Sequence, residues 1–319
     1  MDALLPTTMR AAVERYLTFR RKLGVTLLIE GRELGCFARF ADEVGHTGPL
    51  TTALAVRWAT MPVGRLYHAR RLDIVRRLAR HLAVFDTATE IPPEGLLGPS
   101  YRRRNPHIYS DTEIATLLHA AAHLEPAKGL RPVTYKTLFG LLACAGLRIS
   151  EALHLSRQHV DLETGIVTVI AAKLGRSRLV PLDQTATAAL RAYSERRDQH
   201  HPRPRSNTFF LNEHGTSLKY RKVLVTFVEL RRQLGWTMGR GARPPRIHDL
   251  RHAFVVARLV RWHEQGADID RKIGSLSTYI GHVKVSNTYW YLTAVPELLA
   301  VGAARFEEFA GRDDAGATP

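Results

Sequence analysis

The chain has 319 residues, which is more than one typical domain needs, so we expect two domains that each bury a core. Its 46 Lys and Arg against 30 Asp and Glu leave a formal net charge of +16, which favours a polyanionic partner. No stretch approaches the roughly 18 apolar residues of a membrane span, and Cys36 and Cys144 lack the spacing of a disulfide framework or a cysteine zinc site. Both cysteines are therefore expected in the core of a soluble cytoplasmic protein that does not associate with a membrane.

The first hundred residues predict an α-helical unit. Apolar spacing and capping residues predict helices at 9–23, 29–44, from 51 or 52 to just before Pro62, and at 66–85. The last of these combines an apolar stripe with many cations, so it can bury one face and offer Arg70, Arg71 and Arg77 to phosphates. A solvated basic face fits the same pattern equally well.

Residues 91–106 are rich in Pro and Gly around an arginine run, which predicts a basic linker. Its Arg102, Arg103 and Arg104 are expected to lie along phosphates. Ser110 and Glu113 match the Ser-x-x-Glu capping box that begins a helix. The expected organisation is a helical DNA-binding domain at 1–98, a linker at 99–106, a second domain at 107–310 and a flexible tail at 311–319.

The second domain is predicted to be mostly helical. An apolar helix at 135–145 closes at Gly146, and the segments 166–170 and 179–181 predict a short hairpin. Further helices are expected near 185–197, 218–234, 248–263 and 272–280. The expected fold class is mainly α with a small antiparallel β-sheet.

Four segments of this domain carry residue types suited to phosphoryl chemistry. In chain order they supply Arg148 with Glu151 as its brace, Lys173 with Arg176 on a β-turn, His248 with Arg251 on one helical face, and His282 with Tyr291 nine residues later.

This order of Arg, Lys, His-x-x-Arg, Gly-His and Tyr resembles the active site of the tyrosine recombinase (phage integrase) family, and the basic first domain is similar to that family's core-binding domain. The resemblance implies a site-specific DNA recombinase that cleaves and rejoins strands through a 3′-phosphotyrosyl intermediate, without metal, ATP or cofactor. It implies integration, excision or transposition of a mobile element. It also implies a C-shaped clamp on double-stranded DNA and a tetramer on that DNA, formed alone or with other recombinases, at the nucleoid.

The resemblance further implies a role for each residue. Arg148 and Arg251 hold the non-bridging oxygens of the scissile phosphate. Lys173 protonates the 5′-oxygen, His248 acts as general acid or base, and His282 donates a hydrogen bond to the phosphate.

Tyr291 is implied to be the nucleophile that attacks phosphorus. Tyr289 is a rival that would project from a different side of a helix, and the nine-residue interval after His282 favours Tyr291. Lys173 is followed by Leu174 where the family more often has Gly, so the turn differs there.

Other interpretations remain open. His248 and His252 have the spacing of a His-Glu-x-x-His zinc protease helix, although Asp249 replaces its Glu. A non-cutting DNA-binding regulator would use the basic helix at 221–234 for recognition. A type IB topoisomerase would use the same chemistry on one duplex. The apolar residues of 296–309 would dock on their own domain or on a neighbouring subunit.

Overall fold

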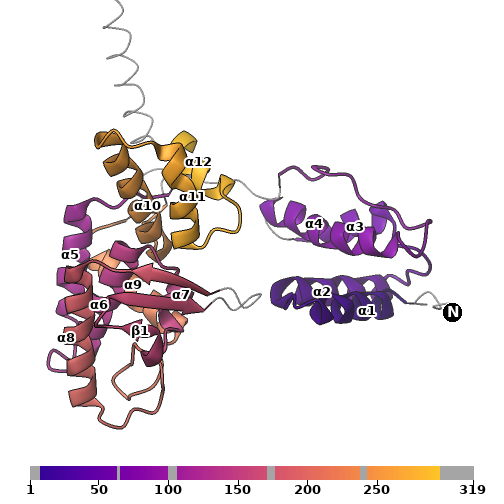
Figure 1. Ribbon diagram of the computed structural model, residues 1–319. Helices are drawn as coiled ribbons and strands as arrows, with labels where there is room; N and C mark the ends of the chain where they lie inside the picture. Colours follow the sequence, from indigo (N-terminus) through magenta and orange to yellow (C-terminus); the bar gives the residue numbers. More distant parts are fainter. Residues whose placement is uncertain (1–7, 63–64, 100–105, 171–176, 238–242, 295–319) are drawn as a thin grey trace, which may run out of the picture. The chain divides into compact units, whose positions relative to one another are not determined.

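A computed structural model describes residues 8–62, 65–99, 106–170, 177–237 and 243–294 (Figure 1). The chain divides into two compact units, Met1–Arg104 and Asn105–Pro319. This division falls within the expected linker, and each unit is described by itself. In the part of the chain that the structure describes, no helix is long and apolar enough to cross a membrane.

The described part of the first unit contains the helices α1 (Met9–Lys22), α2 (Leu28–Glu43), α3 (Thr52–Ala59) and α4 (Arg65–Leu82). Two of the predicted caps are present, because Thr8 and Thr51 accept hydrogen bonds from backbone N–H groups three residues ahead, each at 3.2 Å. The helices pack α1 against α2 and α3 against α4 (Figure 1). Their shared core is built from Val13, Leu34, Phe37, Trp58, Leu72 and Val75.

The second unit is mostly helical, as expected. Its helices are α5 (Asp111–Ala122), α6 (Arg131–Ala145), α7 (Ile149–Leu153), α8 (Gln184–His200), α9 (Tyr220–Gln233), α10 (Ile247–Glu264), α11 (Ile269–Ile280) and α12 (Ser286–Ala294). The capping box predicted at Ser110 and Glu113 is present and begins α5. Gly146, in the left-handed conformation with φ +60°, ends α6.

A small antiparallel sheet lies among these helices. Strands β1 (Val160–Asp161), β2 (Ile166–Ile170) and β3 (Ser177–Pro181) follow the order β1-β2-β3. The hairpin of β2 and β3 pairs Val167 with Val180, and both side chains are buried. The predicted fold class, mainly α with a small antiparallel sheet, is thus confirmed.

Two hydrophobic clusters support the second unit. The larger includes Leu138, Phe139 and Leu142 of α6 together with Leu250 of α10. The smaller joins α10, α11 and α12 through Phe254, Val255, Leu259, Leu276, Ile280 and Tyr291. Of the residues with candidate chemistry, His248 and Arg251 lie on α10 and Tyr291 lies on α12, so the smaller cluster supports the helices that carry them.

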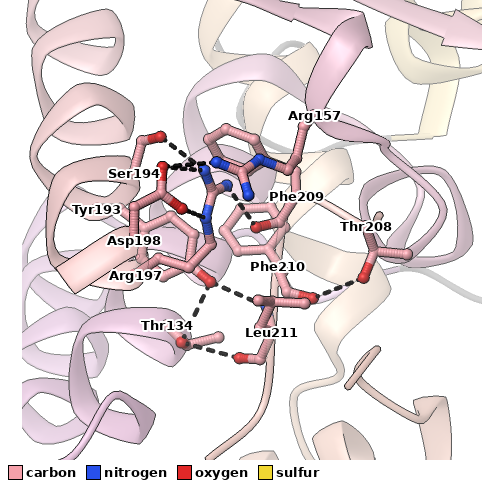
Figure 2. A network of polar contacts seen from close by, with 10 residues as sticks. All are labelled: Thr134, Arg157, Tyr193, Ser194, Arg197, Asp198, Thr208, Phe209, Phe210 and Leu211. Carbon is pink, nitrogen blue, oxygen red and sulfur yellow. Dashed lines mark hydrogen bonds and ion pairs between the residues drawn. The ribbon is translucent and has the colours of Figure 1, made fainter. Parts of the chain in front are cut away.

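The C-terminal part of α8 is held in place by a buried polar network (Figure 2). The guanidinium of Arg197, which is 1 % exposed, donates to Asp198 at 2.8 Å, to the carbonyl of Phe209 at 3.0 Å and to Ser194 at 2.8 Å. Arg157 donates to the same aspartate at 2.6 Å. Because a buried guanidinium needs acceptors for its N–H groups, this network holds the segment around Phe209 against α8.

One expectation for the core is wrong. Cys144 is exposed, although it was expected inside the protein. The side chains of α6 that face the core are Leu138, Leu141, Leu142 and Ala145, at helical spacing, and position 144 lies off this stripe.

Candidate active site

Arg251 projects from the first turns of α10 into the protein. Its side chain is 2 % exposed and donates to the carbonyl of Gly146 at 2.7 Å and to that of Ile280 at 2.6 Å. Asp249 closes the N-terminus of the same helix in a capping box with Arg246. These contacts fix Arg251 between the end of α6 and the end of α11.

Arg148 reaches the turn that follows α11, next to the carbonyl that Arg251 binds. It is the N-cap residue of α7, and it donates to Glu151 at 2.8 Å and to the carbonyl of Gly281 at 2.8 Å. The two arginines therefore bind successive carbonyls, those of Ile280 and Gly281, and their guanidinium groups are neighbours.

The pKa of Arg251 reflects the nearby charge of Arg148. Desolvation, followed by the positive charge of Arg148, lowers the pKa of Arg251 to about 10. The charge of Arg148 thus acts on the buried guanidinium of Arg251. An anion bound between them would relieve this repulsion, which makes the pair a candidate phosphate site.

Glu151 joins Arg148 to the hairpin. Its carboxylate accepts two bonds from Arg178 of β3, at 3.0 and 2.8 Å, besides those from Arg148. Burial works to raise the pKa of Glu151, but the hydrogen bonds from Arg178 and Arg148 outweigh burial and lower it to about 2. Arg178 also donates to the carbonyl of Tyr279 at 2.7 Å.

The sequence interpretation named Glu151 as a brace but missed Arg178. Arg178 lies in the segment that begins at Lys173, together with two other basic residues, Lys173 and Arg176. Nothing in the spacing distinguishes it from its neighbours, because its partners Glu151 and Tyr279 lie 27 and 101 positions away.

The two tyrosines of α12 have different surroundings. Tyr291 is 2 % exposed, and its hydroxyl oxygen lies 2.6 Å from Nδ1 of His252 on α10. Tyr289 is 40 % exposed and donates to Asp270 at 3.0 Å. Of the two, only Tyr291 reaches α10, the helix that carries His248 and Arg251.

The histidines form the remaining part of the site. His282, directly after Gly281, has Nδ1 at 2.8 Å from the hydroxyl of the buried Thr288. The rings of His248 and His252 meet edge to face with centroids 4.8 Å apart. His248 is exposed, yet desolvation and then the charge of Arg251 lower its pKa.

The zinc protease pattern does not gather a set of ligands in this arrangement. Asp249 binds Arg246 at 2.7 Å, and His252 faces Tyr291. Across the described ranges no group of three or more His, Cys, Asp and Glu side chains could hold a metal ion.

The predicted DNA contacts are only partly described. Arg102, Arg103, Arg104 and Arg176 lie outside the described residues, and so does Lys173, the predicted proton donor.

On α4 the predicted contacts differ among themselves. Arg70 and Arg77 are exposed and lie seven residues apart, on the same side of the helix. The side chain of Arg71 is 16 % exposed, binds Glu33 at 3.4 Å and lies over the Trp58 ring at 4.9 Å. Its guanidinium is thus already engaged within the first unit.

Comparison with known proteins identifies the class. The model of the phage integrase family matches residues 109–297. A putative integrase/recombinase of Sinorhizobium fredii, y4rB, is 41 % identical over 308 residues, covering 94 % of this chain and 98 % of the relative. Tyrosine recombinase XerC of Pseudomonas entomophila is 29 % identical and covers 85 % and 86 %.

Solved structures agree in fold. The Tn1549 transposon integrase in complex with transposon right end DNA has a TM-score of 0.68 at 15 % identity, with 93 % of this chain and 99 % of that chain covered. The XerA recombinase has a TM-score of 0.51 at 19 % identity, with 93 % and 98 % covered. The chain therefore belongs to the phage integrase family and is a tyrosine recombinase, an enzyme that cleaves and rejoins DNA strands.

Proposed function

We propose that Tyr291 is the nucleophile of this recombinase and that Arg148 and Arg251 hold the phosphate it attacks. The main support for the proposal is that Arg148 and Arg251 donate hydrogen bonds to two successive carbonyls, those of Gly281 and Ile280. Tyr291 and Ile280 belong to the same hydrophobic cluster, so the proposed nucleophile packs against the helix end whose carbonyl Arg251 binds.

In the proposed reaction the Tyr291 oxygen attacks phosphorus in line with the leaving 5′-oxygen. The O–H bond of tyrosine and the P–O5′ bond break, and a 3′-phosphotyrosyl bond forms. The two arginines neutralise charge that develops on the non-bridging oxygens. His282 donates a hydrogen bond to the same phosphate.

Proton transfer completes the step. Lys173 gives its proton to the 5′-oxygen, and His248 acts as the general base that takes up the proton released by Tyr291 and as the general acid that returns it on rejoining. Rejoining reverses each transfer, because the covalent bond to Tyr291 conserves the energy of the phosphodiester. The reaction, which is that of type IB topoisomerases, needs neither ATP nor a metal ion.

The biological role we propose is recombination of a mobile element. The names of the relatives support this role, since one similar structure is a transposon integrase and the first-mentioned relative is a putative integrase/recombinase. Exchange between two duplexes requires four active sites, so we propose a tetramer on DNA in the cytoplasm. Arg70, Arg77 and the arginines of the linker would contact the DNA phosphates.

The test is covalent trapping. Wild type, Tyr291→Phe and Tyr289→Phe are incubated with duplexes from the flanks of the gene, nicked near the cleavage point so that the cut fragment diffuses away. We expect a denaturation-resistant protein–DNA adduct with wild type and Tyr289→Phe, and at least a 1,000-fold loss with Tyr291→Phe, because phenylalanine has no oxygen to attack phosphorus. An adduct that persists in Tyr291→Phe and disappears in Tyr289→Phe would move the nucleophile to Tyr289.

A further inference from the structure

The hydroxyl of Tyr291 has a hydrogen-bond partner that the proposed reaction does not use. Nδ1 of His252 lies 2.6 Å from this oxygen, and the two rings are tilted by 50° with centroids 5.5 Å apart. His252 follows Arg251 directly on α10, so it extends the row of candidate residues from His248 towards α12. The sequence interpretation noted His252 only as half of a zinc protease pattern.

The surroundings of His252 hold its ring in place. It meets the His248 ring edge to face at 4.8 Å and the Trp290 ring at 6.3 Å. Tyr291 itself is 2 % exposed and packs in the cluster that joins α10, α11 and α12. Both partners of the bond are therefore restrained by packing, which is the condition for a hydrogen bond that orients a reacting group.

The direction of this bond decides what it does. Desolvation, followed by the charges of His248, Arg246 and Arg251, lowers the pKa of His252 to about 3, so the ring is neutral at neutral pH. A neutral imidazole has one nitrogen with a free lone pair. With Nδ1 as that nitrogen, the tyrosine hydrogen points at His252 and the oxygen lone pairs point elsewhere.

We infer that His252 is a positioning residue for Tyr291: its Nδ1 accepts the hydrogen bond of the phenol and so leaves an oxygen lone pair directed for attack. The inference rests on the proposed function of Tyr291 as nucleophile. It differs from a role in proton transfer, because an acceptor that cannot take up a proton would position the hydroxyl equally well.

Two substitutions separate these roles. In His252→Asn the side-chain amide places an oxygen near the position of Nδ1, whereas His252→Leu has similar bulk and no acceptor. We expect His252→Leu to form the covalent adduct at least about tenfold more slowly at saturating DNA, with DNA affinity within about twofold of wild type. We expect His252→Asn to stay within about threefold of the wild-type rate.

Controls guard against a general loss of structure. His263→Leu changes another histidine of α10, on the last turn of that helix, and should cleave like wild type. If His252→Leu fails to fold, which a thermal melt detects, His252→Gln replaces it, because its amide lies one bond too far to reproduce Nδ1. The His252→Asn variant must then form the covalent adduct at least about threefold faster than the His252→Gln variant.

The outcomes are distinct. A wild type that forms no adduct on cognate DNA overturns the proposed function, and this inference with it. If wild type cleaves and His252→Leu or His252→Gln cleaves equally fast, only the positioning role is overturned. If wild type cleaves and His252→Asn is as slow as His252→Leu, an acceptor is not enough and the positioning role is likewise refuted.

Discussion

Glu151 is one carboxylate that binds two guanidinium groups, those of Arg148 and Arg178. It compensates two positive charges that would otherwise repel each other beside the site. Its side chain is 13 % exposed, so water contributes little to this compensation.

We expect Glu151→Gln to lower the free energy of unfolding by about 1–3 kcal/mol at pH 7 and to slow cleavage, because the amide keeps the shape and loses the charge. Urea denaturation and adduct formation measure the two effects. Glu163→Gln is the matched control, since Glu163 is exposed in the turn between β1 and β2. Equal stability of the two variants would contradict the assigned role of Glu151.

The lowered pKa of Glu151 also predicts that the stability difference between wild type and Glu151→Gln depends on pH. The pKa of Glu151 is about 2 in the fold against an ordinary 4.5, so its contribution is complete above about pH 4.5 and disappears as the pH falls towards 2. The stability difference between wild type and Glu151→Gln should therefore shrink over this interval.

At the scale of elements, the turn after α11 accepts hydrogen bonds from both Arg148 and Arg251. Gly281 has φ +69°, and a Cβ there would lie 2.7 Å from a guanidinium nitrogen of Arg178. Its residue type is thus required both by backbone conformation and by the close approach of Arg178.

We expect Gly281→Ala to destabilise the fold by about 1–2 kcal/mol and to reduce cleavage, because alanine resists the left-handed conformation and displaces Arg178. Gly274→Ala is the control on the same helix: nothing lies within 4 Å of a Cβ there, so it should stabilise by about 0.5–1 kcal/mol. Thermal melts and adduct formation measure both variants. A normal cleavage rate in Gly281→Ala would show that the turn tolerates displacement of Arg178.

The network of Figure 2 joins the C-terminal part of α8 to the segment around Phe209. Arg197→Met should cost about 2–4 kcal/mol in unfolding free energy, since it leaves the Phe209 carbonyl and the carboxylate of Asp198 short of donors. Arg196→Met, at an exposed neighbouring position, should change stability by less than about 0.5 kcal/mol. Urea denaturation measures both, and equal midpoints would argue against the network.

Local signals explain which elements were predictable. Thr8, Ser110 with Glu113, and Gly146 act within a few residues of themselves, so the helix ends that they mark were found. Strand β1 was missed because its two residues are too few to display an alternating pattern. Cys144 was misplaced because an apolar neighbourhood does not tell which side of α6 faces the core.

The candidate site was predictable in residue types and not in contacts. The motifs that resemble the family named Arg148, Arg251 and Tyr291. The bonds of Arg178 to Tyr279 and of His252 to Tyr291 join positions 101 and 39 apart, and a single sequence carries no signal for such pairs.

At the scale of the whole molecule, the charge of +16 predicts DNA binding that weakens steeply with salt. Arg70→Ala with Arg77→Ala should weaken binding and reduce the slope of log K against log salt by about 2, without a change in stability. Arg71→Ala should lower stability instead and leave the slope unchanged, because its side chain is held by Glu33 and Trp58. DNA-binding titrations at several salt concentrations measure the slope. An unchanged slope in the double variant would contradict contact between these two arginines and DNA.

The anchoring of Arg148 and Arg251 on carbonyl groups bears on attempts to redirect the enzyme to new target sites. Main-chain oxygens are the same whatever side chain a residue carries, so the bond of Arg251 to Ile280 does not depend on the side chain of Ile280. Val283 and Lys284, just beyond the turn, are exposed, with Val283 at 89 %. A library that randomises these two positions would test whether they affect DNA preference, because neither residue supplies the carbonyls that Arg148 and Arg251 bind.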